Sequence, residues 1–117
     1  MSNPQVEATS SHVILPGLAT VHSHAFQRAL RGRTQRRATA ANSFWSWRGL
    51  MFMLAETLDP DDIYTIARMA YSELALSGVT LVGEFHYLHH GKNGQPYANR
   101  TETAEMCIQA ALDVGMR

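Results

Sequence analysis

The sequence predicts an α/β fold, built as about the first two β/α units of a (β/α)8 barrel, on three observations. Two apolar, strand-like runs, at residues 12–22 and 79–85, alternate with helical patterns, which is typical of parallel sheets. Histidine-rich polar clusters follow both runs, and the carboxyl ends of parallel barrel strands share one face. A closed barrel takes about 250 residues, whereas this chain has 117. We therefore expect a polar remnant at residues 1–11 and a partial barrel domain over 12–117, truncated at its C-terminus.

Composition narrows the class of protein. The chain is 45% hydrophobic and 17% charged, with a formal net charge of zero, which is typical of a globular domain. Zero net charge provides no general attraction to nucleic acid or anionic membranes. Neither a signal peptide nor a run of about 18 apolar residues is visible. The single cysteine, Cys107, excludes an internal disulfide, and we expect a reducing, cytoplasmic location.

The first predicted strand, residues 12–22, contains a Pro-Gly turn signal at 16–17 and leads into a His-x-His sequence. Side chains alternate between the two faces of a strand, so His22 and His24 should point to one side while Ser23 points away. Histidine is the commonest metal ligand near neutral pH. We therefore interpret His22 and His24 as two metal ligands; the alternative is an ordinary pair of loop histidines.

A basic segment follows over residues 25–42, with one helical turn expected at 25–30. Its arginines are Arg28, Arg31, Arg33, Arg36 and Arg37. Nucleic-acid binding of this kind combines basic side chains with stacking aromatics, but no aromatic residue lies between Phe26 and Phe44. We therefore expect a solvated loop beside a pocket for an anionic small molecule, and no nucleic-acid partner.

Residues 43–57 predict a helix with Ser43 as its N-cap. Its apolar stripe recurs at helical spacing and is expected to be core: Phe44, Trp47, Met51, Leu54 and Leu58. Arg48 is the only cation in this stretch. Its guanidinium either reaches solvent along the helix surface or binds a carboxylate through its planar fork.

Asp59 and Pro60 predict the start of a second helix, because aspartate is a good N-cap and proline fits the first helical position. Gly78 should end that helix. A nearly continuous apolar run then predicts a buried strand over 79–85, followed by a loop at 91–99 and a helix over 101–114. The residues expected to face inward on this last helix are Ala104, Cys107, Ile108, Ala111 and Leu112.

Three segments carry a resemblance to a known family. Leu15-Pro-Gly17 followed by His22-Ser-His24-Ala-Phe-Gln27 resembles the first-strand motif of the amidohydrolase superfamily. Ser43-Phe-Trp-Ser-Trp-Arg48 and Glu84-Phe-His-Tyr-Leu-His-His90 are more particular, and they resemble the formimidoylglutamate deiminases within that superfamily. The resemblance covers residues 13–117.

The resemblance implies a (β/α)8-barrel, metal-dependent hydrolase with a small β-sandwich built from both chain ends. One Zn²⁺ is expected, held by His22 and His24 together with a later histidine and a late aspartate. Gln27, Arg48 and Tyr87 match residues that contact the substrate. The implied reaction belongs to histidine degradation: metal-bound hydroxide hydrolyses the C=N bond of N-formimidoyl-L-glutamate to give N-formyl-L-glutamate and ammonia.

In the family, the third histidine ligand, the aspartate ligand and the general acid or base belong to later strands. No residue of this chain is therefore assigned a catalytic role, and the chain alone is expected to be inactive. His86, His89 and His90 are interpreted as pocket wall or structural residues, and Glu84 receives no role. A homodimer of the full-length protein is one expected arrangement.

Two alternatives remain open. One is another amidohydrolase-superfamily deaminase, of the guanine or triazine type, and Arg48 discriminates because a neutral heterocycle has no use for a buried cation. The other is a non-catalytic, truncated polypeptide, which cooperative unfolding of residues 1–117 alone would favour.

Overall fold

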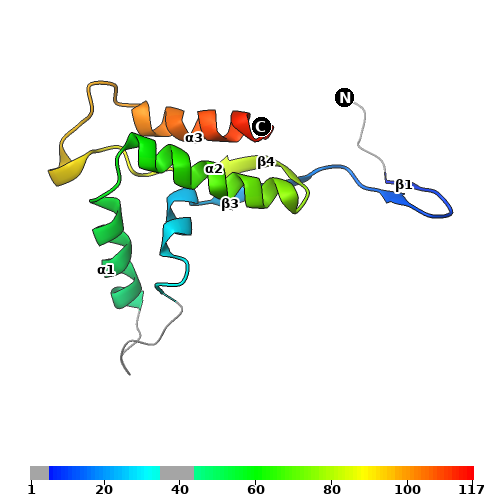
Figure 1. The fold of residues 1–117 in the computed structure, drawn as a ribbon, viewed down its shortest axis with the longest axis horizontal. Helices are drawn as coiled ribbons and strands as arrows, with labels where there is room; N and C mark the ends of the chain where they lie inside the picture. The colour runs from blue at the N-terminus through cyan, green and yellow to red at the C-terminus, as the bar shows by residue number, and fades with distance from the viewer. Residues whose placement is uncertain (1–5, 35–43) are drawn as a thin grey trace.

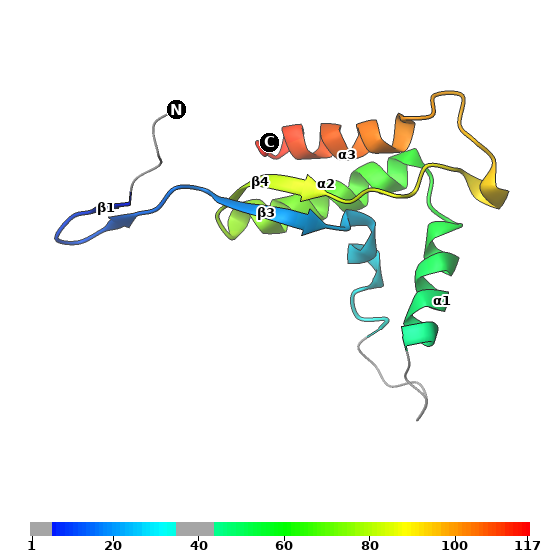
Figure 2. The same cartoon turned by 180° about the vertical axis from the view of Figure 1, so that it is seen from behind.

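The computed structural model describes residues 6–34 and 44–117, and its central feature is a parallel strand pair covered on one face by two helices (Figure 1). The elements in chain order are β1 (Glu7–Ala8), β2 (Val13–Ile14), β3 (Leu18–Ser23), the 3-10 helix η1 (Ala25–Leu30), α1 (Phe44–Ala55), α2 (Pro60–Leu76), β4 (Val79–Glu84), the 3-10 turn η2 (Lys92–Gly94) and α3 (Glu102–Asp113). Figure 2 shows β3 and β4 pointing the same way, so that η1 and the segment after β4 begin at one end of the sheet.

The core lies between the strand pair and the helices α2 and α3, which lie side by side (Figure 1). Ala67 on α2 and Ala110 on α3 are fully buried, and such small side chains let two helices approach closely. The buried apolar cluster is Ala25, Phe26, Leu30, Met51, Leu58, Ile63, Ala67, Tyr71, Cys107, Ala110, Ala111 and Met116. It includes η1, so the segment after the first histidine pair is anchored in the core.

The predicted limits of α2 are confirmed. Asp62 N–H donates to Asp59 Oδ1 at 2.9 Å, and Asp59 N–H donates to Asp62 Oδ2 at 3.3 Å, which makes a reciprocal capping box. At the other end, Gly78 has a φ of +89°, a backbone conformation that glycine adopts without the Cβ clash of other residues. The chain therefore turns at once into β4.

A bulge interrupts the pairing of β3 with β4. Thr20 pairs with Val82 and Ser23 with Glu84, so β3 has one more residue than β4 between these pairs. Gly83 faces this bulge, and a Cβ placed on it would lie 3.1 Å from Val21 Cα. A bulge changes the direction of the side chains around it, and here it lies next to His22.

The N-terminal segment differs from the prediction. We expected an unpaired polar start through residue 11 and a strand from 12, but β1 pairs with β2 in an antiparallel hairpin and the parallel strand begins only at Leu18. Thr9 closes the connection, since its N–H donates to the carbonyl of His12 at 2.8 Å. This turn was not predicted, although threonine side chains commonly stabilise turns through local hydrogen bonds. The hairpin projects away from the rest of the chain (Figure 1).

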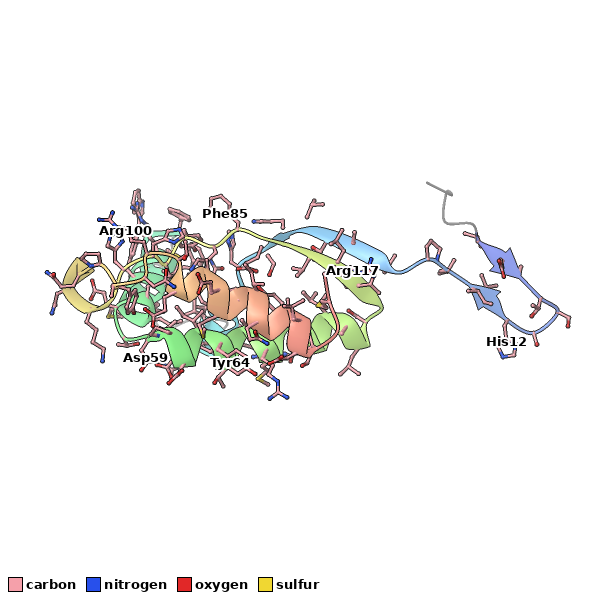
Figure 3. The ribbon with its side chains drawn as sticks, turned by 90° about the horizontal axis from the view of Figure 1, so that it is seen from above. His12, Asp59, Tyr64, Phe85, Arg100 and Arg117 are labelled. Atoms are coloured by element: carbon pink, nitrogen blue, oxygen red, sulfur yellow. The ribbon has the colours of Figure 1, made fainter. Side chains whose placement is uncertain are left out.

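Three burial predictions are also wrong. Phe44, predicted to be core, is 63% exposed, and its ring contacts Trp45 and Trp47 of the same helix. Ile108 and Leu112 are each 60% exposed, because the two-stranded sheet does not extend beneath that side of α3. Leu81 and Phe85 are 48% and 63% exposed, because the helices cover only one face of the sheet; Figure 3 shows Phe85 on the face away from α2 and α3. The predicted N-cap Ser43 and residues 35–42 of the basic loop lie outside the described residues.

Within residues 6–34 and 44–117, none of the helices combines the length and apolar character needed to cross a bilayer.

Candidate metal and substrate site

Two histidines converge at the carboxyl end of β3. His22 is the second-to-last residue of β3, and His24 directly follows the strand. Their Nε2 atoms are 3.0 Å apart, and their rings meet edge to face with centroids 4.6 Å apart. The two side chains therefore point to the same side, as the period of the strand predicted.

His24 is held by the neighbouring strand through its other ring nitrogen. Its Nδ1 lies 3.0 Å from the carbonyl oxygen of Phe85. A carbonyl oxygen can only accept, so the proton resides on Nδ1 and Nε2 keeps a lone pair. Such an outer hydrogen bond fixes the tautomer and the ring orientation of a metal-binding histidine.

Backbone and carboxylate contacts reinforce this junction. Phe85 N–H donates to the carbonyl of Ser23 at 2.8 Å, and Ala25 N–H donates to Glu84 Oε1 at 2.8 Å. Glu84 was not assigned a role from the sequence. Its only sequence signal is a carboxylate placed at the end of an apolar strand, and its partner is 59 residues away.

Gln27 and Tyr87 form a second polar group beside the histidines. Gln27 Nε2 donates to Tyr87 Oη at 2.8 Å, and Tyr87 Oη lies 3.4 Å from Met51 Sδ. The Tyr87 ring contacts His24 and Phe26 edge to face, with centroids 5.3 Å and 5.2 Å away. Met51 was predicted only as core, but it brings α1 to this group.

Arg48 is not part of this group. It is exposed on α1, where its guanidinium lies over the rings of Trp45 and Phe52 at 5.4 Å and 5.1 Å from their centroids. Arg48 precedes Met51 by one helical turn, so the two residues lie on neighbouring parts of the same helix face. The structure thus brings together four of the five predicted site residues: His22, His24, Gln27 and Tyr87.

His86 lies in a separate, structural cluster beneath α3. Its Nε2 lies 3.0 Å from the carbonyl of Leu88 and 3.1 Å from Thr103 Oγ1, and its Nδ1 lies 3.5 Å from Cys107 Sγ. Burial lowers the pKa of His86 and raises the pKa of Cys107 to about 11, so both groups favour the neutral form. His89 contacts the His86 ring, and His90 is exposed.

The histidine pair fits two ligands of one divalent ion. Two nitrogens bound to a single tetrahedral zinc at the usual bond length lie about 3.3 Å apart, close to the 3.0 Å found here. In the part of the chain that the structure describes, no group of three or more His, Cys, Asp or Glu side chains could hold a metal ion. The described residues would therefore provide two ligands, and not the four of a tetrahedral site.

A parallel β/α layer with polar side chains at the carboxyl ends of its strands is the arrangement found in β/α-barrel proteins, whose active sites lie on that face. The particular family follows from comparison with known sequences. The sequence model of the amidohydrolase family matches residues 13–117, and the chain belongs to this family. Its fold is the N-terminal portion of that family's barrel, about the first two β/α units.

Individual relatives agree with this placement. The chain is 41% identical over 103 residues to the formimidoylglutamate deiminase of Pseudomonas aeruginosa, covering 88% of this chain and 23% of that protein. It is 32% identical over 83 residues to the 8-oxoguanine deaminase of the same organism, covering 70% of this chain and 18% of that protein. A crystal structure of an amidohydrolase from Brucella melitensis matches with a TM-score of 0.81 at 46% identity, covering 86% of this chain and 22% of that one. The chain thus spans less than a quarter of the length of these relatives.

Proposed function

We propose that this chain supplies the first two metal ligands and part of the substrate pocket of an iminohydrolase that converts N-formimidoyl-L-glutamate and water to N-formyl-L-glutamate and ammonia. The observation that carries the proposal is the convergence of His22 Nε2 and His24 Nε2, 3.0 Å apart, beside the Gln27–Tyr87 pair. The similarity to a formimidoylglutamate deiminase supports the choice of substrate. We place the reaction in the cytoplasm, where reducing conditions suit the free thiol of Cys107.

The roles of the residues follow from their chemistry. His22 and His24 hold one divalent cation, for which Zn²⁺ is the proposed identity because it accepts imidazole ligands in tetrahedral sites. When bound, such a cation supplies Lewis acidity that turns water into a usable nucleophile at neutral pH. Gln27 and Tyr87 orient the substrate beside the cation through amide and phenol groups. Arg48, which is exposed and stacks on Trp45 and Phe52 outside the histidine group, would bind a carboxylate of the glutamate portion through its planar fork.

Ammonia release from N-formimidoyl-L-glutamate tests this proposal. The assay uses the whole protein encoded by the gene that contains these residues, loaded with Zn²⁺. The same protein carrying His24→Ala, which lacks one proposed ligand, is compared with it. We expect steady ammonia release from the wild-type polypeptide and at least a 100-fold loss in the variant, on the order expected when an essential metal ligand is removed. Equal rates in the two proteins would reject the proposed metal site.

A second candidate reaction is deamination of a purine-like heterocycle, which the 32% identity to an 8-oxoguanine deaminase favours. The two candidate reactions require pockets of different charge, because glutamate derivatives carry two carboxylates whereas the heterocycle is neutral. The same polypeptide should therefore be offered both substrates at equal concentration. Release of ammonia from 8-oxoguanine alone would replace the first proposal with the second.

A further inference from the structure

Glu84 occupies a position that neither the predicted metal site nor the predicted substrate pocket explains. It is the last residue of β4, and its Oε1 accepts the N–H of Ala25 at 2.8 Å. Its other oxygen, Oε2, is buried and has no hydrogen-bond partner in residues 6–34 and 44–117. A buried carboxylate oxygen without a partner is costly, so the placement of this side chain calls for a physical reason.

The reason lies in the N-terminus of η1. His24 stands at the N-cap position of this 3-10 helix, and its side chain makes no capping hydrogen bond there. A helix start normally receives its cap from the N-cap side chain, but the imidazole of His24 is turned toward His22 and toward the carbonyl of Phe85. Glu84 therefore supplies the missing cap from the neighbouring strand.

The contact fixes the backbone on the far side of His24. On the near side, Phe85 N–H already binds the carbonyl of Ser23 at 2.8 Å. The backbone on the two sides of His24 is thus held by Phe85 N–H and by the Glu84 side chain, while the His24 ring binds the Phe85 carbonyl. Because a β-bulge lies just before this point, the pairing of β3 alone does not determine the direction of His24.

We propose that Glu84 is a positioning residue for the metal site: by capping Ala25, it holds His24 in the orientation in which its Nε2 converges with that of His22. Glu84 acts through the backbone and does not touch the metal. This inference rests on the proposed function only in that it requires the two histidines to bind a divalent cation. The expected effect on metal affinity is about 10- to 100-fold, the usual range for residues that orient ligands.

Three substitutions separate the position of the acceptor from its charge. Glu84→Gln keeps an oxygen at the same reach and should keep the Ala25 contact. Glu84→Asp keeps the charge but withdraws the carboxylate by about 1.5 Å, one C–C bond. Glu84→Met keeps the volume and removes the acceptor. Glu73→Met is the matched control, because it removes a glutamate that binds η1 at Arg28 instead of at Ala25.

The experiment measures the dissociation constant and the visible absorption spectrum of Co²⁺ in the polypeptide encoded by this reading frame, together with the melting temperature of the metal-free proteins. We expect Glu84→Asp and Glu84→Met to weaken Co²⁺ binding at least 10-fold and to alter its spectrum. Glu84→Gln and Glu73→Met should stay within about threefold of wild type, even if Glu73→Met melts earlier.

Two results would overturn the inference, and they differ from each other. Unchanged Co²⁺ affinity in Glu84→Asp and Glu84→Met would make Glu84 a stabilising residue only, with the proposed metal site intact. No Co²⁺ binding by the wild-type protein would remove the metal site itself, and the positioning role with it. If Glu84→Met does not fold, Glu84→Asp gives the same decision, because it retains the charge and most of the volume.

Discussion

Gln27 Nε2 lies 2.8 Å from Tyr87 Oη, although the two residues are 60 positions apart in the sequence. One follows β3 and the other follows β4, so the parallel pairing of the strands creates the contact. The same pairing brings the Tyr87 ring against His24. Two of the three proposed substrate residues, Gln27 and Tyr87, are therefore in one connected group with the proposed metal ligands.

Removing the Tyr87 hydroxyl tests its part in this unit. Tyr87→Phe deletes the acceptor for Gln27 and the donor to Met51 while keeping the ring contacts. We expect the KM for N-formimidoyl-L-glutamate to rise about 3- to 10-fold with little loss of stability, the effect of one neutral hydrogen bond. Steady-state kinetics measure this. Tyr64→Phe, which removes a hydroxyl that donates from α2 to Asp113 at the end of α3, is the control and should leave KM unchanged.

Arg48 separates the two candidate substrates. Arg48→Met should raise the KM for N-formimidoyl-L-glutamate about 10-fold or more, because a hydrogen bond to a charged group is lost. Conversion of a neutral heterocycle should change little. Arg100→Met is the matched control, since Arg100 is an exposed arginine of the loop before α3. Equal effects of Arg48→Met on both substrates would contradict the role given to Arg48.

His86 should make stability depend on pH near neutrality. Burial lowers its pKa below the ordinary value of about 6.5, so the unfolded chain binds a proton more readily than the folded one. The free energy of unfolding should therefore fall as the pH drops through 6.5 toward the folded-state pKa. Denaturant unfolding at about pH 7.5, 6.5 and 5.5, which lie on both sides of the ordinary histidine pKa, measures the slope with which the free energy of unfolding changes with pH.

A substitution identifies the group responsible for that slope. His86→Gln keeps hydrogen-bonding capacity toward Thr103 but cannot titrate, so the slope between neutral and mildly acidic pH should flatten. His12→Gln, on the exposed hairpin turn, serves as the control and should keep the wild-type slope. A slope that persists in His86→Gln would assign the pH dependence to other groups.

The capping box of α2 offers a purely structural test. Asp59→Ala removes the acceptor for Asp62 N–H and should lower the free energy of unfolding by about 1 kcal/mol. Asp61→Ala, one position further into the first turn, leaves both capping hydrogen bonds in place and should cost only a few tenths of a kcal/mol through the helix dipole. Chemical denaturation compares the two, and equal losses would mean that the cap contributes nothing of its own.

Local signals predicted much of this structure. The capping aspartate, the glycine at the end of α2 and the alternation that turns His22 and His24 to one side are all properties of a few neighbouring residues. The parallel pairing was also predicted, because strands alternating with helices permit few other arrangements. Family resemblance added Gln27 and Tyr87, which lie together in the structure.

Long-range relationships were beyond the sequence. The contact of Glu84 with Ala25 spans 59 residues and depends on the register of β3 against β4, including its bulge. No local pattern encodes that register. The exposure of Ile108 and Leu112 depends on the width of the sheet, which helical periodicity does not report. The spacing of residues along α1 also does not determine the rotamer of Arg48, so its stacking on Trp45 and Phe52 could not be predicted.

The junction at His24 also sets an order of events during synthesis. The carboxylate that holds the backbone beside this histidine belongs to Glu84 of β4, which follows Ala25 by 59 residues. At ribosomal speeds of about 5–20 residues per second, β4 is made on the order of 3–12 s after β3. During that interval the two imidazoles belong to an unpaired strand whose geometry favours no particular ion. If the two histidines bind the proposed metal, its selective binding therefore follows the pairing of β3 with β4.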